Sequence, residues 1–346
     1  MKNGSALFRK AAIVTAAMAA AGAIFAMSFK SPENRDAGAK AAGTEMTRPA
    51  YLKPGDKIAV LTPAYATDKA KIDRHVEILR QWGFQPVLGP NVGKRYAKAY
   101  AGTVEQRLSD LRWALEDPDI KAIICQRGGY GAIHFIDKLS LKEISRNPKW
   151  IIGYSDITTL LGFATRAGVI SVHGIMGNDI AACDGADTSC VMLRELLCGK
   201  VPSYSVPAHP CNISGSATGR LVGGNICTFA PLLGTDADFT AEGDLILFIE
   251  EVGESFHNLD RQLNILINSG VFDRIKGVIL GDFSDCKADI EYPSAEALLT
   301  SYLKGRGIPV CCGFPAGHGG ENWPLPIGSE TRLKVTSEGA QISFEL

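Results

Sequence analysis

The length, composition and charge of the chain exclude several classes of protein. Its 346 residues exceed the roughly 100–150 residues of one ordinary domain, so we expect two compact units. Hydrophobic residues make up 46% and charged residues 21% of the chain, which is typical of a folded globular protein and argues against wholesale disorder. The formal net charge is −1 and the two signs of charge are interspersed. The chain therefore lacks the basic surface of a nucleic-acid-binding protein, and we expect a small or peptidic partner.

The N-terminal segment over residues 1–30 has the layout of a signal peptide. Three basic residues precede an uncharged, alanine-rich run over residues 11–29, and small residues near Ala26 fit a cleavage site. An uncleaved membrane anchor is the other interpretation, because the run approaches the ~20 residues that span a bilayer, although alanine contributes little to insertion. Under either interpretation we predict an exported protein, periplasmic or associated with the envelope, in which residues 31–48 form a tether.

The chain contains nine cysteines, an odd number that leaves at least one thiol unpaired. None of them forms a CxxC pair or a cysteine–histidine cluster with zinc-finger spacing, so we expect no structural metal. Cys183, Cys190, Cys198 and Cys211 crowd one segment, where a local disulfide would fit an exported protein. Most of the other cysteines lie in apolar runs, and we interpret them as small core residues.

Strand and helix signals alternate in the first part of the folded body, which begins near Pro49. In chain order the expected elements are a strand over 57–62, a helix over 72–82, a strand over 84–88, a helix over 103–115, a strand over 122–125, a strand from 151 and a helix over 156–167. Alternation of this kind predicts a parallel sheet covered on both faces. Functional groups in such sheets gather at the carboxyl ends of the strands.

The pattern weakens over residues 183–214, which contain one helical patch over 191–197. We interpret this stretch as the connection between a first domain over 49–182 and a second domain over 215–346. In the second domain we expect strands over 219–222, 245–249, 277–280, 310–312, 333–335 and 342–344, and helices over 226–233, 258–268 and 294–305. These elements predict a mixed α/β domain with a sheet of its own.

Ser155 lies where a buried strand runs directly into a helix, two residues after Gly153. This layout is typical of a nucleophile elbow, which exposes a serine hydroxyl beside the N–H groups that begin a helix. It departs from the G-x-S-x-G pattern, because Ile157 stands where the second glycine would be. Taken alone, the segment also fits an ordinary helix cap formed by Ser155 or Asp156, which is the more common arrangement.

A glycine-rich turn over residues 126–131 follows a second strand of the same expected sheet. Its spacing matches neither the phosphate-binding loop nor the dinucleotide-binding motif. Its three glycines allow close approach of the backbone to a ligand, and the turn would lie at the same sheet edge as Ser155. Gly128 or Gly129 could thus supply an N–H group to an oxyanion, although a tight turn without chemistry fits these residues as well.

A serine nucleophile needs a base, and the chain has six histidines. His318 lies in a glycine-rich loop after a predicted strand, whereas His75 lies in a helical stretch where we expect it to face solvent. Glu250 ends a predicted strand, and a carboxylate in that place can orient an imidazole and stabilise its charged form. Glu251 or Glu254 would then be a surface residue nearby.

Six motifs occur in an order that resembles the LD-carboxypeptidase family of serine peptidases. They are Arg127-Gly-Gly-Tyr-Gly131, Gly153-Tyr-Ser-Asp-Ile-Thr158, Gly223-Gly-Asn225, Leu247-Phe-Ile-Glu-Glu251, Asp260-Arg261 and Gly317-His318-Gly319. The resemblance extends from about Pro49 to Leu346. It implies a flavodoxin-like or amidotransferase-like N-terminal α/β domain and a mixed C-terminal α/β domain, with the active site between them. Family members commonly form homodimers, which the resemblance therefore implies here as well.

The resemblance also implies the chemistry. Ser155 would be the nucleophile, His318 its base and Glu250 the carboxylate that orients the histidine. The N–H of Asp156 and one N–H from Gly128 or Gly129 would bind the oxyanion. No metal or organic cofactor is required for this chemistry.

The implied substrates are peptidoglycan tetrapeptide stems or muropeptides, from which a C-terminal D-alanine would be released. Such stems lie outside the cytoplasmic membrane, in agreement with export. Arg127 could bind the terminal carboxylate of the substrate or form a structural ion pair with an aspartate. We interpret Asp260 and Arg261 as a packing pair.

Two other functions fit parts of the sequence. A non-hydrolytic protein that binds wall fragments would keep the cleft, but it would not need all three residues of a triad. A peptidase with the same chemistry could act on a peptidyl-nucleotide antibiotic such as microcin C, as some relatives do. Those relatives act inside the cell, so the predicted export argues against this alternative.

Overall fold

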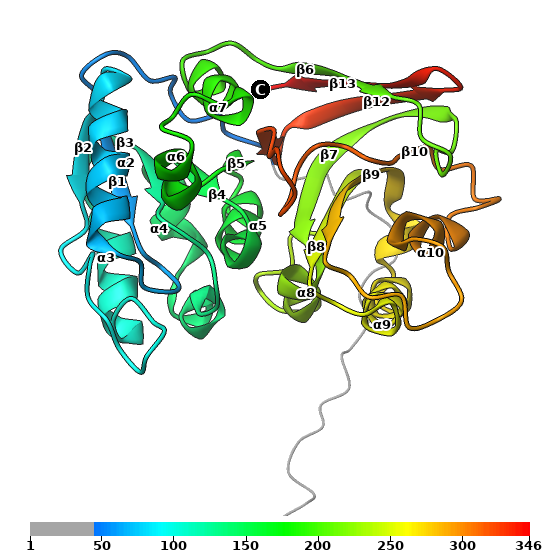
Figure 1. The fold of residues 1–346 in the computed structure, drawn as a ribbon, viewed down its shortest axis with the longest axis horizontal. Coiled ribbons are helices and arrows are strands. Elements are labelled where there is room, and N and C mark those ends of the chain that lie inside the picture. Colours follow the sequence, from blue (N-terminus) through cyan, green and yellow to red (C-terminus); the bar gives the residue numbers. More distant parts are fainter. Residues whose placement is uncertain (1–44) are drawn as a thin grey trace, which may run out of the picture. The chain divides into compact units, whose positions relative to one another are not determined.

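Two β-sheets organise the computed structural model, which describes residues 45–346 (Figure 1). The predicted signal segment over residues 1–30, and most of the predicted tether, lie outside the described residues. No helix in the described range is both long and apolar enough to cross a membrane.

The first sheet has six strands in the order β11-β5-β4-β3-β1-β2. Its strands are β1 (Lys57–Leu61), β2 (Gln85–Leu88), β3 (Ile120–Cys125), β4 (Trp150–Gly153), β5 (Ser171–His173) and β11 (Leu325–Ile327). The first five are parallel, and β11 pairs antiparallel with β5. The helices that follow these strands are α2 (Lys69–Gln81), α3 (Val104–Glu116), α4 (Leu141–Ser145), α5 (Thr158–Arg166) and α6 (Gly177–Ala182).

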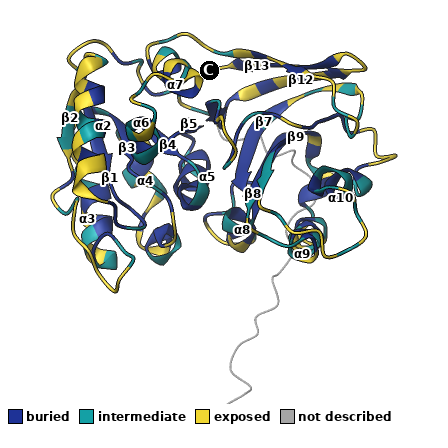
Figure 2. Ribbon diagram, in the orientation of Figure 1, coloured by how far each residue is buried: buried dark blue, intermediate teal, exposed yellow. Residues whose placement is uncertain are grey.

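The inner strands of the first sheet are mostly apolar and buried because both faces of the sheet are covered. Ile58 and Val60 join one buried cluster, whereas Ala59 and Leu61 join the other. Successive side chains of a strand point to opposite faces, so each face packs against its own layer. Figure 2 shows the inner strands as buried, whereas the edge strand β2 and the outer sides of the helices are partly exposed.

The second sheet has seven strands in the order β10-β9-β8-β7-β12-β13-β6. They are β6 (Ser203–Pro207), β7 (Gly215–Asn225), β8 (Leu245–Val252), β9 (Ile275–Ser284), β10 (Val310–Cys311), β12 (Glu330–Thr336) and β13 (Gly339–Glu345). Strands β7 to β10 are parallel, and β12, β13 and β6 continue the sheet antiparallel. The helices of this part are α8 (Ile226–Phe229), α9 (Phe256–Asn268) and α10 (Ala295–Ser301). The α/β fold class predicted from the sequence, with a mixed second sheet, is confirmed.

The stretch over residues 183–214 contributes to both sheet layers. Helix α7 (Thr188–Leu197) buries Leu193 and Leu196 in one of the two clusters of the first sheet, and β6 forms the edge of the second sheet. Conversely, β11 comes from the C-terminal part of the chain and pairs in the first sheet. The exact domain boundaries stay predictions, but the chain crosses between the two layers more than once.

The two sheets meet near the carboxyl ends of β4 and β7. The N–H of Asn225, the last residue of β7, donates to the Thr158 hydroxyl at the start of α5 over 3.2 Å. A side chain on Gly224 would collide with Thr158, since an added Cβ would lie 2.6 Å from its hydroxyl oxygen. This close contact brings the ends of β7 and β8 up to the segment that contains Ser155.

Candidate active site

Ser155 occupies a strained turn between β4 and α5. Its φ is 61°, in the left-handed region that residues other than glycine seldom adopt. A residue that merely caps a helix has an extended backbone, as Thr103 does at the start of α3 with a φ of −66°. The geometry of Ser155 is therefore that of an elbow and not that of an ordinary cap.

The departure from the G-x-S-x-G pattern has a packing explanation. Ile157 is buried directly over Gly153, where an added Cβ would lie 2.8 Å from the Ile157 side chain. Because Gly153 has no side chain, the Ile157 side chain fits against it, and a second glycine at position 157 is not needed for the turn to close. The turn remains tight although its second glycine is replaced.

The glycine-rich turn lies directly against Ser155. A Cβ placed on Gly128 would lie 2.9 Å from the Ser155 Cβ, 3.1 Å from its hydroxyl oxygen and 3.4 Å from the Asp156 nitrogen. Gly129 has a φ of 115° and packs against the Tyr65 ring instead, which an added Cβ would approach to 2.4 Å. Of the two glycines predicted beside the oxyanion, Gly128 is the one in contact with the serine.

His318 and Glu250 form a hydrogen-bonded pair on the second sheet. The His318 Nδ1 atom lies 2.7 Å from Oε2 of Glu250, which is completely buried in β8. Burial has the largest single effect and would lower the pKa of His318. The hydrogen bond to Glu250 and the negative charges of Glu250, Glu251 and Asp179 together outweigh it, so the pKa lies above its usual value. A proton is thus held on the Nδ1 side of the ring, which leaves Nε2 as the atom that can accept another.

Tyr154 lies between the His318–Glu250 pair and the turn that contains Ser155. Its ring meets the His318 ring edge to face, with the ring centroids 4.9 Å apart, and Ser155 is the next residue along the chain. Within residues 45–346 the Ser155 hydroxyl has no hydrogen-bond partner, so a direct bond to His318 is not formed. Catalytic hydrogen bonds are often long in ligand-free enzymes and tighten when substrate binds. The structure therefore brings Glu250 and His318 together and places the histidine against the turn that contains the serine.

Two family models match the chain: the LD-carboxypeptidase N-terminal domain over residues 58–174 and the LD-carboxypeptidase C-terminal domain over residues 218–333. The chain belongs to the LD-carboxypeptidase family. It is a serine-type carboxypeptidase, as the sequence predicted.

Relatives and a solved structure agree with this assignment. The murein tetrapeptide carboxypeptidase of Pseudomonas aeruginosa is 30% identical over 290 residues, which cover 80% of this chain and 93% of that protein. The microcin C7 self-immunity protein MccF of Escherichia coli is 29% identical over 331 residues, which cover 85% of this chain and 94% of that protein. The crystal structure of muramoyltetrapeptide carboxypeptidase from Oxalobacter formigenes superimposes with a TM-score of 0.77 at 26% identity, over 84% of this chain and 99% of that chain.

The carboxylate of Asp156 has a structural role in this LD-carboxypeptidase that the sequence did not reveal. It is buried, and its Oδ2 atom accepts the N–H of Ala132 over 2.9 Å. Burial raises the pKa of this carboxyl group, against the opposing effect of its backbone hydrogen bonds. Arg107, which is also buried, donates to the Gly131 carbonyl over 2.7 Å. Together these contacts hold the glycine-rich turn against the nucleophile turn, while the N–H of Asp156 stays available for the predicted oxyanion.

The prediction that Glu251 or Glu254 lies on the surface is wrong for Glu251. Only 3% of Glu251 is exposed, because adjacent residues of a strand point to opposite sides and both sides of β8 are buried here. Its carboxylate accepts hydrogen bonds from Asn225 Nδ2 over 2.7 Å, from the Cys227 N–H over 3.0 Å and from the Val252 N–H over 2.8 Å. Glu251 thus fixes the end of β7 through these hydrogen bonds. Glu250, its neighbour in β8, points its side chain toward His318 instead.

The solvent-facing position predicted for His75 is also wrong. Its side chain is completely buried between α2 and the first sheet, and Nδ1 lies 2.9 Å from Oε1 of Gln126. Burial lowers the pKa of His75 to about 4, so this ring is neutral at physiological pH. His75 therefore holds the side chain of Gln126, the residue directly before Arg127 in the glycine-rich turn.

Arg127 forms no ion pair with any residue of the described range, so the predicted ion pair with an aspartate is wrong. Its guanidinium donates to the Ala66 carbonyl over 3.3 Å and lies 5.7 Å from the centre of the Tyr65 ring. Its contact with a substrate carboxylate stays a prediction. The guanidinium retains donors for such a contact, because one backbone bond engages a single N–H.

Asp260 and Arg261 do not pair with each other. Asp260 accepts the hydroxyl of Tyr302, whereas Arg261 donates to the side chain of Asn258 over 3.0 Å. Successive residues of a helix point in different directions, so each finds its own partner. Neither residue has a hydrogen bond to Glu250 or His318 within residues 45–346, so we interpret both as structural residues of α9.

Two residues that the sequence did not single out hold the loop on either side of His318. Asn322 accepts the N–H of Gly317 over 3.2 Å, and Asp282 at the end of β9 accepts the N–H of Gly319 over 3.1 Å. Asp282 is a carboxylate near the end of a strand, as Glu250 is. The same sequence signal could therefore have identified it as a candidate site residue. Asn322 follows the loop without any local pattern and could not have been found in this way.

Proposed function

We propose that this LD-carboxypeptidase is exported and releases the C-terminal D-alanine from peptidoglycan tetrapeptide stems with Ser155, His318 and Glu250. The observation that supports the proposal most is the strained Ser155 turn, packed against Gly128, beside a histidine that a buried carboxylate holds at 2.7 Å. The names of the Pseudomonas aeruginosa and Oxalobacter formigenes proteins support the substrate class.

In the proposed mechanism the Ser155 hydroxyl attacks the carbonyl carbon of the peptide bond before D-alanine. His318 accepts the hydroxyl proton at Nε2, and Glu250 stabilises the resulting imidazolium through the bond at Nδ1. The oxyanion lies between the Asp156 N–H and the Gly128 turn, whose backbone Asp156 and Arg107 hold in place. His318 then returns the proton to the amine of D-alanine as the acyl-enzyme forms, and water releases the shortened stem by the reverse use of the same groups.

The His318 side of the site depends on the fixed orientation of the imidazole. Glu250 sits at the carboxyl end of β8, and Gly317 has a φ of 134° where an added Cβ would lie 3.0 Å from the glutamate. The absence of a side chain at this position lets the loop bring the ring onto the carboxylate. A positioned base and a positioned nucleophile together account for an activated serine without any bound cofactor.

A substrate panel tests the activity and separates it from its rivals. Purified protein is incubated with a tetrapeptide stem, the same stem lacking D-alanine, and a peptidyl-nucleotide, and the products are identified by mass spectrometry. We expect D-alanine from the tetrapeptide alone. Cleavage of the peptidyl-nucleotide alone would favour the alternative of an antibiotic-cleaving peptidase, in line with the similarity to the microcin C7 self-immunity protein MccF. Tight binding of the stem without cleavage would indicate a wall-fragment binding protein.

Export is tested on the native envelope. The proposal is supported by the basic start and alanine-rich run of the N-terminal segment, and N-terminal sequencing should find a new terminus near Ala23 or Ala26. An intact Met1 on membrane-bound protein would establish the anchor, whereas an intact Met1 in the cytoplasmic fraction would contradict export.

A further inference from the structure

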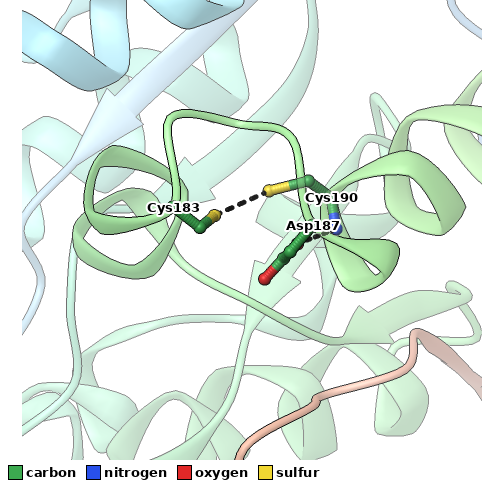
Figure 3. A group of neighbouring side chains, drawn as sticks. All are labelled: Cys183, Asp187 and Cys190. Carbon is green, nitrogen blue, oxygen red and sulfur yellow. Dashed lines mark hydrogen bonds between the residues drawn. The ribbon is translucent and has the colours of Figure 1, made fainter.

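Cys183 and Cys190 flank the loop that joins α6 to α7, and their sulfur atoms lie 3.4 Å apart (Figure 3). Cys183 is half-buried and Cys190 is completely buried, and both are free thiols in the structure. Figure 3 shows both side chains directed toward the same gap between the two helix ends, with Asp187 beside them. A short approach of the two sulfurs would bring them to bonding distance.

The backbone, and not flexible side chains, produces this proximity. Cys183 is the C-cap residue directly after α6, and the next two residues, Asp184 and Gly185, reverse the chain with φ angles of 54° and 68°. Asp187 caps α7 by accepting the N–H of Cys190 over 2.7 Å. Because one cysteine ends a helix and the other lies in the first turn of the next helix, closure requires little rearrangement of the chain.

We propose that Cys183 and Cys190 form a disulfide by exchange with a small-molecule or protein disulfide. Cys183, the more accessible residue, attacks one sulfur of the oxidant as a thiolate and forms a mixed disulfide, which releases the first thiolate of the oxidant. Cys190 then attacks the Cys183 sulfur, which forms the internal bond and releases the second thiolate. The two cysteine protons and two electrons pass to the oxidant, which ends as two thiols. The proposal needs export only as the source of an oxidising compartment and does not depend on the proposed substrate.

The position of the pair suggests what the bond would stabilise. Ser189, the neighbour of Cys190, accepts the N–H of Asn322 over 2.9 Å, and Asn322 in turn accepts the N–H of Gly317 next to His318. The disulfide would therefore brace the segment on which the His318 loop rests. The second exchange step is expected to be slow, because burial raises the pKa of the Cys190 thiol and leaves little thiolate.

A metal ion is the competing occupant, because Asp187 completes a group of three side chains whose ligand atoms lie within 4.8 Å of one another. Structural zinc sites use four protein ligands, and this group offers three from the described part of the chain. One carboxylate oxygen of Asp187 is already engaged by the Cys190 N–H. The two sulfurs are adjacent, and the Asp187 carboxylate is already hydrogen-bonded to the backbone. Both observations favour a disulfide over a bound metal ion.

Mass spectrometry tests the bond directly on the full chain. The protein is equilibrated with oxidised glutathione, alkylated under denaturing conditions and digested with trypsin, which leaves Cys183 and Cys190 together in the peptide 167–194. We expect this peptide without alkyl groups and lighter by two hydrogen atoms. Cys198 is exposed and falls in a separate peptide, so it reports unspecific reaction with glutathione. Alkylation of both cysteines, or glutathione retained on both, would overturn the proposal.

Thermal melts of the oxidised and reduced proteins provide the second readout. A bond that closes a loop of this length should raise the Tm by about 4 °C in a chain of this size, while turnover at low temperature stays the same. The shift should vanish in Cys183→Ser and persist in Cys198→Ser. A shift that survives in Cys183→Ser would assign it to another pair. Zinc that survives dialysis of the reduced wild type and is lost from both Cys183→Ser and Cys190→Ser would replace the disulfide with a metal site.

Discussion

The two halves of the candidate site are held in place by different means. On the first sheet the backbone positions the serine: Ser155, just after β4, has a φ of 61°, and Gly128 packs against it without a side chain. On the second sheet side-chain hydrogen bonds position the histidine, from Glu250 to its ring and from Asn322 and Asp282 to its loop. Substitutions in the first half should therefore act through steric conflict, and those in the second half through lost polar contacts.

The largest effect should come from the nucleophile itself. Ser155→Ala should lower D-alanine release on the order of 10⁴-fold or more, because the residual rate then depends on binding and oxyanion contacts alone. The Tm should change little, since a half-buried hydroxyl without a partner contributes little to packing. The double variant Ser155→Ala/His318→Ala should be scarcely slower than either single variant, as is typical of residues that act as one unit.

Turnover and thermal melts measured on the same preparations check this prediction. Turnover near that of the wild type in Ser155→Ala would exclude covalent catalysis at this residue. Glu250→Gln should also be severely impaired. If it retained full activity, a carboxylate other than Glu250 would orient the histidine.

The glycine turn should give the next largest effect. An added methyl group at Gly128 would lie 2.9 Å from the Ser155 Cβ, so Gly128→Ala must displace either the serine or the turn. We expect kcat to fall about 10²- to 10³-fold, the range for loss of one oxyanion donor, with KM less affected. Gly320→Ala is the matched control, because an added Cβ there meets nothing within 4 Å and its φ is not positive. Equal activity of the two alanine variants would contradict the backbone-based positioning of the serine.

The sequence predicted those parts of the molecule that have a local signature. Strands β1 and β3 were predicted because burial on both faces makes their runs over 58–61 and 122–125 continuously apolar. The three-residue strands β5 and β11 were missed, because Ser171–His173 and Leu325–Ile327 are too short for a period to be recognised and β11 contains a proline. These two strands pair with each other although about 150 residues separate them, so a short window of sequence cannot reveal the pairing.

The same limit applies to the site. Ser155, Glu250 and His318 could be proposed from the sequence because each ends or follows a strand and belongs to an ordered family motif, and their catalytic roles stay predictions. The burial of Glu251 was missed, since a pattern does not show that both sides of a strand end are covered. His75 was misjudged although it shares the buried face of α2 with Ile72 and Leu79, because its partner Gln126 lies 51 residues away along the chain. Contacts between distant segments decide all of these cases.

The acid–base pair should produce opposite pH dependences of activity and stability. Catalysis requires a neutral His318 that can accept the serine proton, so kcat/KM should rise with pH and reach half its maximum above the usual histidine pKa of about 6.5. The stabilisation from the raised pKa is fully present below the unfolded value and is lost as pH rises through the folded pKa. The Tm of the wild type relative to Glu250→Gln should accordingly be higher near pH 5.5 than near pH 8.5.

Profiles of kcat/KM and Tm over this pH range check both signs. In Glu250→Gln the midpoint of the residual activity should move to lower pH, because burial then lowers the pKa of His318 without opposition from the carboxylate. An unchanged midpoint would mean that Glu250 does not set the protonation of the base.

The smallest effect should come from the residue that holds the histidine loop without touching its ring. Asn322→Ala removes the acceptor for the Gly317 N–H, so we expect kcat to fall roughly ten-fold, less than the ~100-fold that a displacement of about 1 Å can cost. The midpoint of kcat/KM against pH should stay in place, because the bond from His318 to Glu250 remains. Asn264→Ala, which removes a partly buried asparagine of α9 far along the chain from this loop, is the control for a general loss of stability. If both variants lose the same activity at equal Tm, Asn322 has only a packing role. A loss of activity confined to Asn322→Ala would establish that side-chain contacts to the loop, and not the backbone alone, place the base in this half of the site.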